Sequence, residues 1–237
     1  MLEIRRLSKT YSKGKKAVED LSLDILAGDI YGFIGPNGAG KTTTIRAIVG
    51  VMDFDEGEIY IEGHCVRAAP IACKSVTGYI PDNPDIYAFL TGVQYLSYIA
   101  DIFSISRNRR EAGIAKYSGI FGMSSALGDP ISSYSHGMRQ KLVLIGALIH
   151  EPKFLVLDEP FVGLDPEASF HLKKIMRELC ESGRAIFFST HILEVAEKLC
   201  SKIAIIREGK LIVSGPIDQV RGQKSLEKIF LEVVGHE

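Results

Sequence analysis

The fold is decided by the segment Gly35-Pro36-Asn37-Gly38-Ala39-Gly40-Lys41-Thr42, which matches the pattern G-x-x-x-x-G-K-[ST]. It follows an apolar run at 30–34 that predicts a strand, and it opens a segment at 41–51 whose apolar residues recur at helical spacing. Glycines let backbone N–H groups close around phosphates, and the start of a helix adds partial positive charge. The order strand, glycine-rich turn, helix therefore predicts a phosphate-binding loop, which we call the P-loop.

Each polar residue at the end of the P-loop has an expected role. Lys41 is predicted to reach the β- and γ-phosphates of a nucleotide as a point charge, and the hydroxyl of Thr42 is predicted to coordinate Mg²⁺. The sequence therefore predicts a nucleotide with Mg²⁺, held by Gly35, Pro36, Asn37, Gly38, Ala39, Gly40, Lys41, Thr42 and Thr43. A loop of this kind alone would fit kinases, GTPases, motors and many ATPases.

Two adjacent carboxylates end a second apolar run. Asp158 and Glu159 follow the predicted strand at 154–157, where charge is costly unless a cation or a reacting water compensates it. Asp158 is predicted to bind Mg²⁺, and Glu159 is predicted to act as a general base that polarises the attacking water. A helix-capping role for the pair is the alternative.

Outside these motifs, the chain alternates between strand-like and helix-like patterns. Strands are predicted at 2–4, 18–25, 30–34 and 59–61, and the pattern becomes helical from 91 to 149. Strand and helix alternate again after Pro152, with strands at 154–157, 184–188 and 203–206, a hairpin at Gly209 and one or two amphipathic helices after Pro216. Such alternation is typical of an α/β domain with a mostly parallel sheet.

Composition and charge narrow the choice of partners and location. Hydrophobic residues make up 46% of the 237 positions, as in globular proteins, and 28 Lys and Arg against 29 Asp and Glu argue against a nucleic-acid partner. The longest uncharged run in the middle of the chain, 86–100, has 15 residues, whereas a membrane-spanning helix needs about 20. Charges in the first nine residues argue against a secretion signal, so a cytoplasmic location is expected.

Further motifs give the chain a family resemblance that runs from residue 2 to residue 215. Tyr11 precedes the P-loop, Tyr134-Ser135-His136-Gly137-Met138 begins a predicted helix, Gly163-Leu164-Asp165-Pro166 follows the carboxylates, and Ser189-Thr190-His191 ends the next strand. In this order they resemble the adenine-stacking aromatic residue, the signature, the D-loop and the switch histidine of the ATP-binding subunits of ABC transporters.

The resemblance implies a fold with three parts in a single domain, 1–237. It implies a P-loop NTPase core of α/β type with a mostly parallel sheet at 1–85 and 150–215, which includes an antiparallel β subdomain. It also implies an inserted α-helical subdomain at 86–149, followed by a helical tail at 216–237.

The resemblance also implies a site shared by two subunits that pack head to tail, as a homodimer or a heterodimer. In this arrangement Ser135 and Gly137 contact the γ-phosphate held by the other subunit, and Asp165 orders the interface. His191 contacts the γ-phosphate and holds the attacking water with Glu159, while Tyr11 stacks on adenine.

Three positions depart from the family pattern. Asp82 follows Gly78-Tyr79-Ile80-Pro81 where the family usually has a glutamine, and it is a candidate Mg²⁺ ligand. In the signature, His136 replaces a glycine and Met138 a glutamine, although Ser135 and Gly137 remain. A consequence of these departures to be tested is ATP hydrolysis that is slow or is regulated by the partner.

The function implied by the resemblance is an ATPase subunit that powers a separate integral-membrane subunit, peripheral on the inner face of the membrane. The segments Pro-Asp-x-Pro, Leu-Thr-Gly and Ser-x-Gly-Met-x-Gln-Lys resemble the branch that exports drugs, antimicrobial peptides or ions. Phe89, Leu90, Tyr95 and Tyr98 either form the docking face for the membrane subunit or pack the helical subdomain. The alternatives are a soluble ABC-type ATPase that serves assembly or regulation, and a nucleotide-binding module without turnover.

Overall fold

The first sheet is antiparallel and has the strand order β2-β1-β4-β5. The computed structural model describes residues 1–12 and 14–235, so the last two residues of the predicted tail lie outside the described residues. The strands of this sheet are β1 (Leu2–Thr10), β2 (Lys16–Ile25), β4 (Glu56–Ile61) and β5 (His64–Cys65). Apolar side chains at alternate positions, including Leu2, Ile4 and Ile59, face the interior, so one side of the sheet is buried.

The second sheet has the strand order β10-β9-β3-β8-β7-β6. All its neighbouring strands run parallel except β10, which pairs with β9 as the predicted antiparallel hairpin. Its strands are β3 (Ile30–Ile34), β6 (Thr77–Ile80), β7 (Phe154–Asp158), β8 (Ala185–Thr190), β9 (Lys202–Arg207) and β10 (Lys210–Pro216). The two sheets with their helices confirm the predicted fold class.

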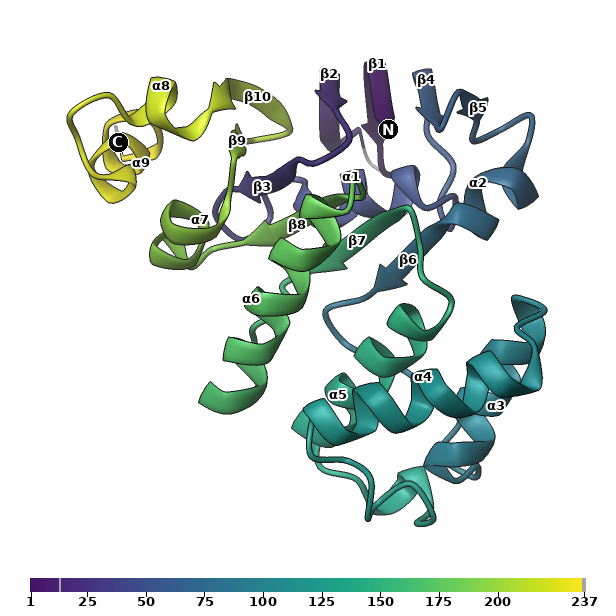
Figure 1. Ribbon diagram of the computed structural model, residues 1–237. Helices are drawn as coiled ribbons and strands as arrows, with labels where there is room; N and C mark the ends of the chain where they lie inside the picture. The colour runs from purple at the N-terminus through teal and green to yellow at the C-terminus, as the bar shows by residue number, and fades with distance from the viewer. Residues whose placement is uncertain (13, 236–237) are drawn as a thin grey trace.

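Helices cover the parallel sheet and form a separate group below it (Figure 1). Near the sheets lie α1 (Lys41–Ile48), α2 (Pro70–Val76), α6 (Pro166–Glu181) and α7 (Leu193–Leu199). The lower group consists of α3 (Gly92–Ile102), α4 (Arg107–Ile120) and α5 (His136–Ile149), and a 3₁₀ turn (Ile131–Ser133) precedes α5. The tail forms α8 (Ile217–Arg221) and α9 (Leu226–Val234).

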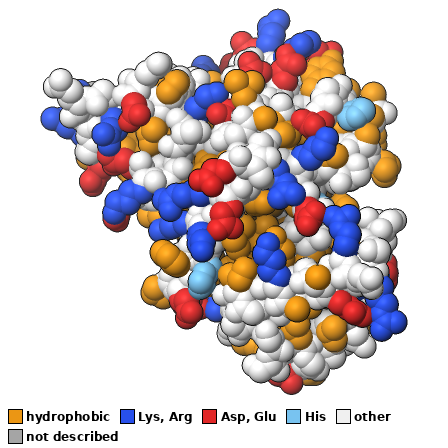
Figure 2. Space-filling model, viewed as in Figure 1, with side chains coloured by type: hydrophobic (Ala, Val, Ile, Leu, Met, Phe, Trp, Pro, Cys, Tyr) orange, Lys and Arg blue, Asp and Glu red, His pale blue; other side chains and the backbone are white. Residues whose placement is uncertain are grey.

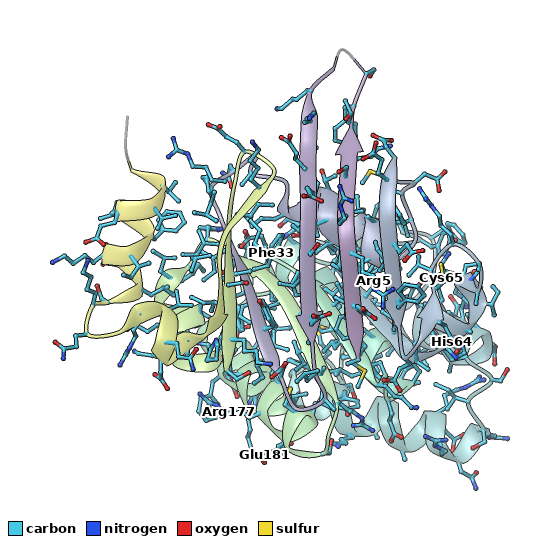
Figure 3. All side chains as sticks on the ribbon, turned by 90° about the horizontal axis from the view of Figure 1, so that it is seen from above. Arg5, Phe33, His64, Cys65, Arg177 and Glu181 are labelled. Carbon is cyan, nitrogen blue, oxygen red and sulfur yellow. The ribbon has the colours of Figure 1, made fainter. Side chains whose placement is uncertain are left out.

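The core has two layers because the strands of the parallel sheet are buried on both faces. Along β3, Tyr31 and Phe33 pack with α1 and the antiparallel sheet, whereas Ile30 and Ile34 pack with the helices on the other side. Phe33 is fully buried and lies to one side of the antiparallel strands when the molecule is seen from above (Figure 3). The P-loop, which follows β3, therefore starts from one of the best-anchored strands.

The lower helices have well-defined starts. Thr91 and Gln94 form a capping box at α3, and the Ser135 hydroxyl accepts a hydrogen bond from the N–H of Met138 at the start of α5. All three helices fall within the predicted insertion at 86–149, although its boundaries stay a prediction. Figure 2 shows hydrophobic side chains gathered in the hollow between this group and the sheets. None of the helices in the described part of the chain is long and apolar enough to cross a membrane.

The observed elements differ from the predicted ones in several respects, among them β1, which continues to Thr10 instead of ending at residue 4, and β5, which was not predicted. Helix α1 ends at Ile48 rather than at residue 51, because the chain turns at Gly50 with a φ of 65°. Strand β6 and helix α2 were not predicted. The strand has only four residues, one of them Gly78, and a short buried strand lacks the polar alternation that identifies strands in a sequence.

Candidate nucleotide site

The site forms where three parallel strands end at the same edge of the sheet. Ile34, the last residue of β3, pairs with Thr190, and Asp158, the last residue of β7, pairs with Ser189. This register places the P-loop, the two carboxylates and the switch histidine next to one another. Ligands commonly bind at the carboxyl ends of strands in open α/β sheets.

The P-loop requires glycine at specific positions. Gly40 has a φ of 109°, and a side chain there would collide with the backbone carbonyl of Ala17. A Cβ added at Gly35 would lie 2.5 Å from the carbonyl oxygen of Ile206. The loop is therefore packed closely against its neighbours while its other side faces the site.

Lys41 is almost entirely buried and is held from both sides. Its Nζ donates hydrogen bonds to the carbonyl oxygens of Gly35, at 2.7 Å, and of Pro36, at 3.3 Å. On the other side Nζ lies 3.4 Å from Oε1 of Glu159. The ammonium group is thus fixed at the mouth of the loop, where phosphate oxygens would receive its charge.

Glu159 links the P-loop to the switch histidine. Its Oε2 lies 3.0 Å from Nδ1 of His191 and accepts the backbone N–H of His191 at 3.3 Å. The residue has a φ of 49°, in the left-handed region that non-glycine residues adopt at a cost. The carboxylate therefore sits between a fixed cation and an imidazole, with its backbone held in a strained conformation.

Asp158 has the properties expected of a magnesium ligand. Its Oδ1 accepts a 2.5 Å hydrogen bond from the Ser189 hydroxyl, while its buried Oδ2 has no hydrogen-bond partner. Burial raises the pKa of Asp158, and the nearby hydroxyls of Ser189 and Thr42 oppose that rise. An unpartnered buried carboxylate oxygen close to a threonine hydroxyl fits Mg²⁺.

No group of three or more His, Cys, Asp or Glu side chains suited to a metal occurs within residues 1–12 and 14–235.

A cavity of about 260 Å³ opens in front of these groups. The Tyr11 hydroxyl lies 3.2 Å from Oγ1 of Thr43, and Asp82 and Glu159 also line the cavity. The structure thus brings most of the predicted nucleotide residues together with Lys15 and Ala17, which the sequence patterns did not indicate. The complete lining is Tyr11, Lys15, Ala17, Pro36, Asn37, Gly38, Gly40, Lys41, Thr42, Thr43, Asp82 and Glu159.

The signature serine, the signature glycine and the D-loop aspartate do not line this cavity. Asp165 caps α6 by accepting the N–H of Ala168 at 2.8 Å and pairs with Lys141 at 2.5 Å. These contacts, the backbone N–H first, hold the pKa of Asp165 below its ordinary value. Ser135 and Gly137 begin α5 beside the D-loop. These predicted site residues therefore form a second group, joined to each other and separate from the P-loop cavity.

Sequence reasoning overlooked the role of Ser189. Its hydroxyl donates to Asp158 and accepts the backbone N–H of Glu159 at 3.0 Å, so one buried side chain holds the carboxylate of Asp158 and the backbone of Glu159. A polar residue at the end of an otherwise apolar strand, immediately before Thr190 and His191, was the available signal.

Comparisons with known proteins agree with this geometry. The family model described as ABC transporter matches residues 18–162. An uncharacterized ABC transporter ATP-binding protein of Bacillus subtilis, YhcH, is 39% identical over 216 residues, which cover 90% of this chain and 68% of that protein. The linearmycin resistance ATP-binding protein LnrL of the same organism is 31% identical, over 91% of this chain and 69% of LnrL.

Among solved structures, an ATP-binding subunit of an ABC transporter superposes with a TM-score of 0.94 at 33% identity, over 98% of this chain and 99% of that one.

Proposed function

The chain belongs to the ATP-binding subunits of ABC transporters, the ATPases that power transport, and from this premise we propose that it drives a separate membrane subunit that exports its cargo. The observation that carries the proposal is the convergence of Lys41, Asp158, Glu159 and His191 at the mouth of one P-loop. Export is supported by the likeness to a resistance protein, LnrL. The expected location is the cytoplasmic face of the membrane, where the chain is bound through its partner.

The chemistry follows from the positions of the side chains. The P-loop amides and Lys41 hold the β- and γ-phosphates, and Tyr11 stacks on adenine. A water attacks the γ-phosphorus while Glu159 accepts its proton, and ADP leaves as the bond to the bridging oxygen breaks. His191, already hydrogen-bonded to Glu159, orients the carboxylate and would contact the γ-phosphate.

The proposed magnesium ligands are Thr42 and Asp158, with Asp82 as a further candidate at the cavity wall. When bound, Mg²⁺ neutralises phosphate charge. Asp158 is prepared for this role because Ser189 fixes one of its oxygens and leaves the other unpartnered.

We expect the active form to be a dimer, since the second group of site residues lies outside the cavity of its own chain. In a head-to-tail dimer, Ser135 and the Gly137 N–H of one copy complete the phosphate site of the other. Whether the other copy is identical or a related chain, the same contacts are required.

A docking face for the membrane subunit is proposed on the helical part. Phe89 is 81% exposed and Tyr98 44% exposed, and both contact Tyr87 in an exposed aromatic cluster. Leu90 and Tyr95, by contrast, pack inward, so they support the subdomain rather than offer a surface.

An apolar cavity of about 360 Å³ lies between α1, α2 and β6 on one side and α3 and α5 on the other, so that α3 carries both Tyr98 of the cluster and part of the cavity lining. Exposed aromatic residues beside an apolar hollow are typical of a surface that receives a helix. Phe89→Ser should abolish co-purification with the membrane subunit while nucleotide affinity is retained.

The proposed mechanism is tested with Glu159→Gln. The amide cannot accept the proton of water, yet the groups that hold ATP remain, so the variant should accumulate an ATP-bound dimer in analytical ultracentrifugation with MgATP. Lys41→Ala serves as the matched control and should stay monomeric. A Glu159→Gln protein that binds ATP but remains monomeric at every concentration would refute the shared site.

The second candidate function, a soluble ABC-type ATPase for assembly or regulation, predicts co-purification with a soluble scaffold instead of a membrane protein.

The proposed parts of the domain are the core at 1–85 and 150–215, the helical subdomain at 86–149 and the tail from 216.

A further inference from the structure

The imidazole of His136 packs on the D-loop of the same chain. A Cβ added at Gly163 would lie 2.7 Å from Cδ2 and 3.0 Å from Nε2 of His136, so the ring covers the space that a side chain at Gly163 would need. Gly163 also has a φ of 81°, which favours glycine. The ring and the glycine backbone are therefore in direct contact.

Two further contacts join the same elements. A Cβ added at Gly137 would lie 2.7 Å from the carbonyl oxygen of Gly163, so the start of α5 approaches the D-loop backbone closely. One turn further along α5, the Nζ of Lys141 lies 2.5 Å from Oδ2 of Asp165. The beginning of α5 and the beginning of α6 are thus held together by a ring, a backbone approach and an ion pair.

This arrangement bears on the residues that a second copy would meet. Ser135 precedes His136 and Asp165 lies two residues after Gly163, so both border the contact. If α5 and the D-loop moved independently, each would have to be ordered when the dimer forms, and that ordering opposes association. A fixed spacing between α5 and the D-loop presents Ser135 and Asp165 to the second copy as one preorganised surface.

We propose that His136 is a positioning residue for ATP hydrolysis: by packing on Gly163 it fixes the spacing between the signature serine and the D-loop aspartate that a second copy must engage. This inference rests on the proposed shared site. It assigns a role to a residue that stands where the family resemblance has a glycine, which carries no side chain to make the contact.

The structure favours packing over a direct phosphate contact for this ring. Within the described residues the imidazole makes no hydrogen bond or ion pair, and His136 does not line the nucleotide cavity of its own chain. Because the imidazole acts by packing, another planar ring that lacks nitrogen atoms should be able to replace it.

The test is a double-mutant cycle in the Glu159→Gln chain, read as the dissociation constant of the MgATP-dependent dimer. Gly163→Ala places a methyl group against the ring and also strains the backbone. The strain persists when His136→Gly removes the ring, but the collision does not. We expect Gly163→Ala to weaken dimerisation at least fivefold more when His136 is present than when the chain also carries His136→Gly. His136→Gly alone should weaken it severalfold.

His136→Phe separates packing from phosphate binding. It should keep dimerisation within about threefold of the parent, whereas a contact through the imidazole nitrogens would be lost. The affinity of the monomer for a fluorescent ADP should be the same in all variants, because the ring lies outside the cavity. This readout also shows that each variant is folded.

A parent chain that does not dimerise with MgATP overturns the shared site and this inference with it. A parent that dimerises while the two substitutions are additive within twofold, or while His136→Phe behaves like His136→Gly, overturns only the role of His136.

Discussion

Removal of the Ser189 hydroxyl should slow ATP turnover far more than it weakens nucleotide binding. Ser189→Ala deletes the donor to Oδ1 of Asp158, in a buried hydrogen bond, and the acceptor of the Glu159 N–H, in a part-buried one. A buried polar group left without its partner costs about 1–3 kcal/mol, and the figure is larger for a charged group. Loss of about 1.4 kcal/mol of transition-state stabilisation is tenfold in rate.

If the polar groups left without Ser189 stay unpartnered in the transition state, the loss of stabilisation corresponds to a rate about 10- to 100-fold lower. The kcat for MgATP should therefore fall by that amount. Binding of ADP should change by less than about threefold, because the P-loop amides and Lys41 do not depend on Ser189. The assays are steady-state phosphate release and titration calorimetry on the full chain.

The matched control is Ser118→Ala, which removes another buried serine hydroxyl. Ser118 lies on α4 and its hydroxyl lies 3.0 Å from that of Ser124, away from the nucleotide cavity. Ser118→Ala should lower the free energy of unfolding about as much as Ser189→Ala does, but it should leave the turnover of ATP unchanged. The reasoning is refuted if Ser189→Ala keeps its kcat within twofold, or if both variants lose turnover equally.

Two other perturbations have defined outcomes. Lys41→Ala should lower ATP turnover by about 10²-fold or more, as removal of a preorganised donor does at other enzyme sites, and an unchanged rate of phosphate release would exclude the assigned role. His150 stacks on Phe103 beside the apolar cavity, and burial lowers its pKa from 6.5 to about 4. The unfolded chain therefore takes up the proton first, so the free energy of unfolding should fall by about 2 kcal/mol between pH 7.5 and pH 5 in urea titrations; His150→Leu should remove that part of the pH dependence, and an identical slope in both proteins would contradict it.

The residues that sequence patterns identified share one property: their role is set by neighbours along the chain. The P-loop is contiguous, and Asp158 and Glu159 directly follow an apolar run, so spacing alone placed them at a strand end. The family model and the superposition confirm the P-loop fold to which these motifs belong. The individual catalytic and metal roles stay predictions.

What the sequence left undetermined depends on pairing across the sheet or between helices. Ser189 meets Asp158 only because β7 and β8 are parallel and in that register. Lys41 and Glu159 are far apart in the chain, and no local pattern reports their contact. The packing of His136 on Gly163 likewise depends on how two helices meet. Such contacts follow from tertiary structure, which overrides local preference.

The left-handed backbone at Glu159 opposes selection for thermal stability to selection for catalytic activity. A non-glycine residue in that conformation costs about 1–2 kcal/mol, which glycine would recover. A laboratory search for heat-resistant variants of this protein that does not measure turnover should therefore select glycine at this position, and under the proposed role of Glu159 the selected variants would not hydrolyse ATP. Under that proposed role, stabilising substitutions have to leave residue 159 unchanged and be placed elsewhere in the chain.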